Sequence, residues 1–160
     1  MDIHNTEKLV ADAEIALNKG ECEAAYKLIE PLLAEDNPGA LFIYSHFSFA
    51  GSETEEEFDK RRIEMLKRAA DQGYGPAIYT LGTCYEIGDL VEADPIYAAE
   101  LLRIAAEMGY SKAKFRHGLN LYYGSNGMPK NESKGLELIH AAANAGVEEA
   151  SEYLNHQGMN

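Results

Sequence analysis

The stretch from Ala77 to Gly109, AIYTLGTCYEIGDLVEADPIYAAELLRIAAEMG, decides the fold of this chain. Apolar residues recur at helical spacing in both of its halves. Between the halves, Gly88 is a typical helix stop, and Asp94 followed by Pro95 is a typical N-cap with proline at the first helical position. The stretch therefore predicts two helices joined by a turn.

The same pattern returns on both sides of this stretch. Ala113 opens a second copy 36 residues after Ala77, and an earlier copy opens at Ala40 and closes at Gly73. A period near 36 residues is typical of stacked helical hairpins, none of which can bury its apolar face alone. Once one inserted loop residue is allowed, the second copy repeats seven further markers of the first: Gly118, Gly124, Asn131, Gly135, Ala142, Ala143 and Gly146.

These markers resemble the Sel1-like repeat family, a relative of the tetratricopeptide repeats, with the pattern A-x-x-x-L-G-x-x-Y-x-x-G, then D, then A-A-x-x-G. The copy from Ala77 matches nearly every marker, whereas the copy from Ala113 has His117 and Leu121 at the leucine and tyrosine positions. The resemblance covers about residues 11 to 154 and implies a right-handed α-solenoid that holds other proteins together. The copy from Ala40 departs further at the leucine, glycine and tyrosine positions: Tyr44, Ser45 and Ser48.

We therefore expect an all-α fold, a right-handed α-solenoid of stacked helical hairpins with about nine helices in a single domain. Pro31 predicts a kink or an early end in the second helix. The expected parts are an N-terminal hairpin, three repeats and a C-terminal capping helix: residues 1–39, 40–76, 77–112, 113–147 and 148–160. The expected helices span residues 6–18, 21–34, 40–50, 54–72, 75–87, 94–108, 111–123, 132–145 and 148–156.

Composition limits where the protein acts and what it binds. The chain has no run of 18 apolar residues, and its N-terminus lacks the pattern of a signal peptide, so we expect a cytoplasmic protein. Cys22 and Cys84 lie in different repeats, which favours reduced thiols over a disulfide framework. The net charge of −13 argues against nucleic acid and anionic membranes as partners and favours a basic protein.

Motifs for catalysis or cofactors are absent from the sequence. It contains no H-E-x-x-H, C-x-x-C or G-x-S-x-G motif and no glycine-rich phosphate loop, so we expect neither an enzyme nor a cofactor. The acidic run from Glu53 to Glu57 lacks the order of a calcium loop and indicates a solvated helix start. Five histidines share no pair at metal-ligand spacing, so no metal site is expected: His4, His46, His117, His140 and His156.

A column of aromatic residues is the candidate partner-binding site. By analogy with tetratricopeptide repeats, the first helix of each repeat lines a concave groove, and the position two before the family leucine points into it. That position is Phe42, Tyr79 and Phe115 in the three copies, and aromatic side chains are preferred anchors of protein interfaces. The alternative is that these rings pack between repeats. Residues four and seven further along complete the column: His46, Phe49, Thr83, Glu86, Leu119 and Tyr122.

Three classes of function are compatible with these observations. The favoured class is a non-catalytic protein, monomeric when free, that grips a basic protein in its groove, in its sharpest form a bacterial immunity or antitoxin-like protein. The second class is an adaptor or regulator in a bacterial signalling or envelope-stress complex, with several weaker partners. The third is a hydrolase of the cysteine-rich repeat type, which no constellation of residues in the sequence supports.

Overall fold

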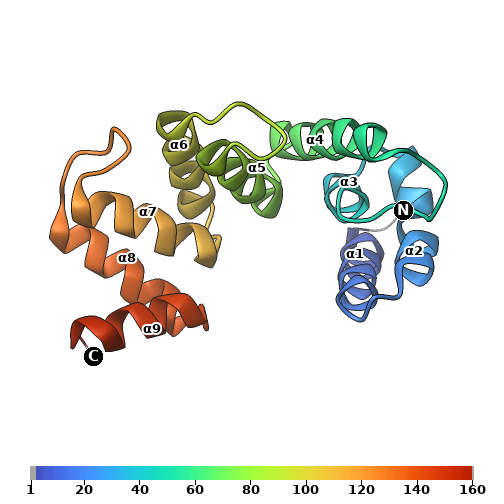
Figure 1. Ribbon diagram of the computed structural model, residues 1–160. Helices are drawn as coiled ribbons and strands as arrows, with labels where there is room; N and C mark the ends of the chain where they lie inside the picture. Colours follow the sequence, from blue (N-terminus) through green and yellow to red (C-terminus); the bar gives the residue numbers. More distant parts are fainter. Residues whose placement is uncertain (1–2, 160) are drawn as a thin grey trace. The chain divides into compact units, whose positions relative to one another are not determined.

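The computed structural model describes residues 3–159; residues 1, 2 and 160, at the outer ends of the expected N-terminal hairpin and capping helix, lie outside this range. The described part contains nine α-helices and no strand, as Figure 1 shows, so the all-α prediction is confirmed. The helices are α1 (Ile3–Asn18), α2 (Cys22–Ala34), α3 (Pro38–Tyr44), α4 (Glu55–Asp71), α5 (Gly75–Ile87), α6 (Pro95–Glu107), α7 (Ser111–Tyr123), α8 (Glu132–Asn144) and α9 (Glu148–Gln157).

The chain divides into two compact units, which we describe one at a time. The N-terminal unit ends at Ala77, and the C-terminal unit begins at Ile78. The boundary lies inside α5, next to the position where the sequence predicts a repeat to begin.

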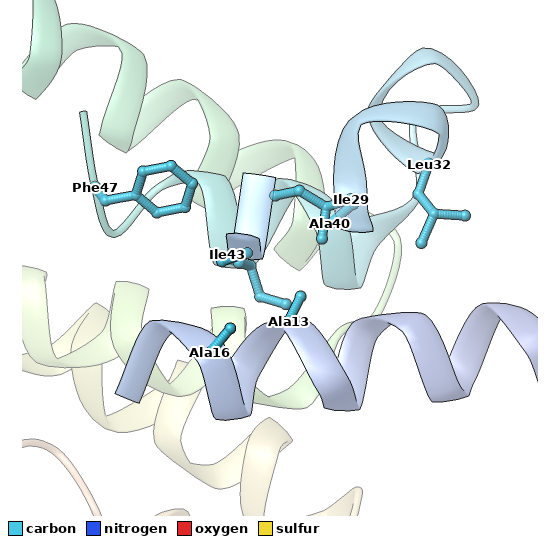
Figure 2. Close-up of a cluster of buried hydrophobic side chains, with 8 residues drawn as sticks. Ala13, Ala16, Ile29, Leu32, Ala40, Ile43 and Phe47 are labelled. Atoms are coloured by element: carbon cyan, nitrogen blue, oxygen red, sulfur yellow. The ribbon is translucent and has the colours of Figure 1, made fainter. Parts of the chain in front are cut away.

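The core of the N-terminal unit is formed by α1, α2, α3 and the loop after α3. Figure 2 shows Ala13 and Ala16 of α1 beneath Ile43 of α3. Each large apolar side chain in this cluster contributes about 1.5–3 kcal/mol by leaving water. Eight buried residues make up the cluster: Ala13, Ala16, Ala25, Ile29, Leu32, Ala40, Ile43 and Phe47.

Helix α2 continues through Pro31 to Ala34, as the expected span of residues 21–34 requires, so of the two alternatives at this proline the early end does not occur. Pro31 lies in the last turn and is exposed, while Ile29 and Leu32 on either side of it are fully buried. Burial of these two side chains keeps the last turn helical, although Pro31 has no backbone N–H to donate a hydrogen bond.

Helix α3 is shorter than predicted: it ends at Tyr44 instead of residue 50. The side chain of Arg61 donates hydrogen bonds to the backbone carbonyls of Tyr44 (2.7 Å) and Phe47 (2.9 Å). A continuing helix would need the Tyr44 carbonyl as an acceptor for its own next turn. Glu53 holds Arg61 in place with two hydrogen bonds, of 2.6 and 3.0 Å, so the loop is fixed to α4 by one guanidinium group.

In the C-terminal unit, the two predicted hairpin repeats use the same N-cap. The side chain of Asp94 accepts a hydrogen bond from the backbone of Tyr97 (2.9 Å), and that of Asn131 accepts one from Lys134 (3.0 Å). The caps predicted at these two matching positions are therefore present. Small side chains fill the interior of this unit, and six buried alanines are 0–1% exposed: Ala98, Ala99, Ala105, Ala113, Ala142 and Ala150.

Helices α7 and α8 cross at two glycines. A Cβ atom on Gly135 would lie 2.7 Å from the carbonyl oxygen of Gly118 and 2.7 Å from the backbone nitrogen of Tyr122. The glycine of α5 that matches Gly118 is less confined, because a Cβ on Gly82 would lie 3.3 Å from the Leu102 side chain and 3.4 Å from a carbonyl oxygen. The α7–α8 crossing therefore requires glycine, whereas a methyl group at the α5–α6 crossing would need the Leu102 side chain to shift by a few tenths of an ångström.

We predict that Gly135→Ala lowers the free energy of unfolding by about 2 kcal/mol, because the added methyl group pushes two backbones apart. The gain in helix propensity, about 1 kcal/mol, offsets only part of this cost. Gly82→Ala is the matched control and should stay within about 1 kcal/mol of the parent chain. Urea denaturation measures both variants, and equal losses would contradict the difference between the two crossings.

His117 occupies the position where the repeat pattern has leucine, and the structure buries it. Its side chain is 8% exposed, and its Nδ1 atom has no hydrogen-bond partner among the described residues. Burial lowers the pKa of His117 below its usual value of 6.5, and the nearby Arg103 lowers it further, while Glu107 and Glu100 act in the opposite direction. The folded chain therefore holds His117 neutral at a pH at which the unfolded chain protonates it.

We predict that acid destabilises the fold through His117. The unfolded state binds this proton near pH 6.5, and the folded state binds it only at a lower pH, so the stability lost through this residue begins near pH 6.5 and grows on further acidification. His117→Leu removes the titrating group and the unpaired nitrogen, so it should gain about 1 kcal/mol at pH 7 and show a smaller fall towards pH 5. Thermal unfolding across this pH range measures the difference; parallel curves for the two chains would contradict the prediction.

Candidate functional site

The nine residues of the predicted column are divided between the two units. Phe42, His46 and Phe49 lie in the N-terminal unit. The other six lie in the C-terminal unit: Tyr79, Thr83, Glu86, Phe115, Leu119 and Tyr122.

In the N-terminal unit, two of the three predicted residues lie together. The half-buried ring of Phe42 lies 4.5 Å from the ring of His46, edge-on, and 5.5 Å from the ring of Tyr74. His46 is exposed, and its Nδ1 lies 2.7 Å from the Phe42 carbonyl oxygen. Because a carbonyl oxygen can only accept, Nδ1 is the donor of this bond, which fixes the imidazole beside Phe42. The sequence pattern did not single out Tyr74 as part of this group.

The predicted place of Phe49 on the same helical face is wrong, because α3 ends at Tyr44. Phe49 lies in the following loop, where its ring packs 5.3 Å from Tyr26 of α2 and 5.7 Å from Phe47. These edge-on contacts attach Phe49 to the core of the N-terminal unit.

In the C-terminal unit, Tyr79 of α5 and Phe115 of α7 border one small pocket of about 60 Å³. Tyr79 also packs against Tyr110, with ring centroids 5.2 Å apart. Tyr79 and Phe115 are each only half-buried, so part of each ring remains in contact with solvent. We call this pocket and its six lining residues the Tyr79–Phe115 surface: Tyr79, Lys112, Phe115, Arg116, Val147 and Glu149.

Charges of both signs surround the two rings. The side chain of Arg116 forms an ion pair with Glu86, which links α7 to α5. Burial raises the pKa of Tyr79 above its ordinary value, although Arg116 opposes this effect. The Tyr79 hydroxyl therefore keeps its proton at neutral pH and can both donate and accept a hydrogen bond.

The remaining predicted residues are engaged by the chain itself. The Thr83 hydroxyl donates a hydrogen bond to the Thr80 carbonyl of its own helix, at 2.7 Å. Leu119 packs against the core cluster of α8 and α9, and Tyr122 lies edge-on to Tyr123 at 5.0 Å. The alternative of packing within the chain therefore describes Leu119, and in part Phe115, which packs against the same cluster, better than it describes Tyr79.

The column prediction missed the basic character of α7. This helix carries Lys112, Lys114 and Arg116 and no acidic residue, although the whole chain has a net charge of −13. The sequence contains these three basic residues as a local run, but the net charge of the whole chain does not indicate them. The α5–α7 ion pair, in contrast, joins residues 30 positions apart and has no local sequence signal.

Within the part of the chain that the structure describes, no group of three or more histidine, cysteine, aspartate and glutamate residues is arranged to hold a metal ion. Every helix within residues 3–159 is too short or too polar to cross a membrane.

The fold and this aromatic surface define a helical-repeat protein of the tetratricopeptide-like class. The Sel1 repeat model matches residues 63–74, 75–110 and 111–147, which together make up more than half of the chain. The chain belongs to the Sel1 repeat family. Members of this family are protein-interaction scaffolds.

Two solved structures have a similar fold. The crystal structure of a Sel1 repeat protein from Oxalobacter formigenes covers 89% of this chain, with a TM-score of 0.72 and 25% identity, and the match spans 56% of that protein. Cysteine rich protein B of Helicobacter pylori covers 91% of this chain and matches over 96% of its own length, with a TM-score of 0.56 and 21% identity. The second likeness concerns the fold alone.

Two curated relatives are fungal proteins named as regulators. The chitin synthase regulator SKT5 of Malassezia restricta is 30% identical over 93 residues, or 55% of this chain. Chitin synthase regulatory factor 3 of Schizosaccharomyces pombe is 38% identical over 95 residues, or 57% of this chain. The matches span only 6% and 10% of the lengths of these relatives.

We predict that Leu119→Ala lowers the free energy of unfolding by about 2 kcal/mol, because its side chain packs against buried residues of α8 and α9. Thr83→Ala should change it by less than about 0.5 kcal/mol, since it removes only a hydroxyl bonded to its own helix. Chemical denaturation gives both values. A loss below about 0.5 kcal/mol at Leu119 would contradict this packing role and favour Leu119 as a binding residue.

Proposed function

We propose that the chain is a non-catalytic protein that binds a basic protein partner through the first helices of its repeats. The observation that carries this proposal is the Tyr79–Phe115 surface, where two half-exposed rings on α5 and α7 border one pocket. Phe42 of α3 and His46 of the turn that follows it provide a second aromatic group. Partly exposed rings beside charged groups are suited to interface anchors, because they bury a large apolar area and fix its orientation.

The basic character of the partner follows from charge. A net charge of −13 attracts a basic protein and raises its association rate at low salt. Near the two rings the charge balance is closer to neutral, because Arg116 is paired with Glu86, and Lys112 and Glu149 line the same pocket. The surface as a whole therefore steers the encounter, and the aromatic rings provide the short-range contacts.

Two biological settings are compatible with such binding. An immunity or antitoxin-like protein would hold one basic toxin tightly, and the high negative charge favours this version. An adaptor or regulator would hold several partners weakly, and the names of the two fungal relatives favour this one. Affinity purification from the native host separates them: one stoichiometric basic protein supports the first, and several substoichiometric proteins support the second.

We also propose that the protein acts in the cytoplasm as a monomer when it is free. Neither Cys22 nor Cys84 forms a disulfide bond among the described residues. Free thiols are favoured in a reducing compartment.

We predict that Tyr79→Ala raises the partner's dissociation rate at least tenfold, which corresponds to about 1.4 kcal/mol, while the fold stays intact. Tyr97→Ala is the matched control, because Tyr97 is an exposed tyrosine of the second helix, α6, and should have little effect. Surface plasmon resonance with the purified partner measures both rates, and circular dichroism checks the fold.

Phe115→Ala is a second test of the same surface. Because the Phe115 ring also packs against Tyr153, with ring centroids 6.1 Å apart, this variant should be somewhat less stable than the parent chain. Its binding should therefore be measured well below its unfolding temperature. An acidic partner, or equal dissociation rates for the parent chain, Tyr79→Ala and Phe115→Ala, would overturn the proposal.

We predict that both cysteines react with a thiol reagent when the protein is purified without reductant and then unfolded. Two thiols per chain would support the proposed compartment. A single intramolecular bridge would contradict it and favour an exported protein.

A further inference from the structure

A pocket of about 330 Å³ lies in the N-terminal unit, between α1 and the start of α3. Its volume is at the lower end of the range of ligand sites, about 300–1,000 Å³, so it is suited to one or two side chains or a small molecule. Apolar groups line much of it, including Val10, Ala11, Pro38 and the ring of Tyr74. The helices are closely packed at its base, because a Cβ on Gly39 would come within 2.8 Å of Val10.

The charged residues that line this pocket are all negative. Glu7 and Glu14 lie two turns apart on α1, so they lie on the same side of this helix. None of the nine lining residues is a lysine or an arginine. Glu7 forms an exposed ion pair with His4, 3.9 Å long. The pocket therefore combines an apolar interior with two carboxylates that are accessible to a cation.

The pocket is continuous with part of the predicted binding column. Tyr74, which lines the pocket, lies 5.5 Å from Phe42, and Phe42 lies edge-on to His46. A partner segment that contacts Phe42 is thus close to the pocket.

We propose that this pocket binds an arginine or lysine side chain of the basic partner. The methylene stem of that side chain lies against Val10, Pro38 and Tyr74, and its charged end lies between Glu7 and Glu14. Long basic side chains need this combination, because their stems are apolar and only their ends are charged. Tyr74 adds an aromatic ring, which attracts a cation placed over its face. The inference rests on the proposed function, and it specifies that an arginine or lysine of the partner binds in the pocket between α1 and α3.

A blocked peptide with one central basic residue tests the pocket without the partner. The probe is acetyl-Gly-Ser-Leu-Ala-Arg-Ala-Leu-Ser-Gly-amide, and its control carries citrulline, a neutral isostere, in place of arginine. We expect the arginine peptide to shift the backbone NMR signals of Val10, Ala11, Gly39 and Tyr74 in the full chain. The citrulline peptide should bind at least about threefold more weakly.

Isosteric variants separate the local contact from the overall charge. Glu7→Gln and Glu14→Gln should each weaken the arginine peptide about threefold, and the double variant should bind both peptides equally. Glu30→Gln makes the same charge change at an exposed position of α2 and should leave the affinity nearly unchanged.

Three results would overturn the inference: equal affinity for the two peptides, an equal loss in Glu30→Gln and Glu14→Gln, or shifts that map to the Tyr79–Phe115 surface. If one of these results is found and Tyr79→Ala still speeds dissociation of the partner, the pocket assignment is wrong but the proposed function is supported. If the arginine peptide binds more tightly than the citrulline peptide but the native partner is acidic, the pocket assignment stands and the proposed function is contradicted.

Discussion

Small residues at the helix crossings are the constraint on which this structure depends. A helical hairpin with a single apolar stripe is stable only if its two helices approach closely and the next hairpin covers the remaining face. At the α7–α8 crossing the backbones are so close that Gly118 and Gly135 leave no space for a methyl group. Buried alanines have the same role elsewhere in the C-terminal unit, as Ala105 and Ala142 illustrate.

This constraint also explains where the large side chains lie. Because the crossings are filled by glycine and alanine, rings such as Tyr79 and Phe115 remain only half-buried, at the edge of the core. Residues held in this way by rigid helices are preorganised, so a partner that binds them loses little side-chain entropy on association. The same packing that stabilises the repeats therefore creates a surface suited to protein binding.

Much of the fold could be predicted because the periodic markers are local and physically specific. The turn at Gly88 and the caps at Asp94 and Asn131 each depend on a few adjacent residues, and the structure contains them. The end of α3 could not be predicted, because it depends on Arg61, which lies 17 residues after the Tyr44 carbonyl that it binds. A local sequence pattern therefore predicts where a helix lies, but it does not predict its end where a side chain distant in sequence binds a backbone carbonyl.

The candidate site was less predictable for the same reason. The aromatic positions followed from the repeat register, and the structure brings Tyr79 and Phe115 to one pocket. The ion pair of Arg116 with Glu86 depends on which helices are neighbours, and sequence spacing does not give this information.

The most direct test of the central claim is a map of partner contacts by photo-crosslinking. A benzophenone-bearing phenylalanine analogue would replace Tyr79, Phe115 or Tyr97, one at a time, and each chain would be irradiated with its native partner. The account predicts crosslinks from the positions of Tyr79 and Phe115, on the first helices, and none from the position of Tyr97 on α6. Crosslinks from the Tyr97 position alone would contradict it and place the binding surface on the second helices.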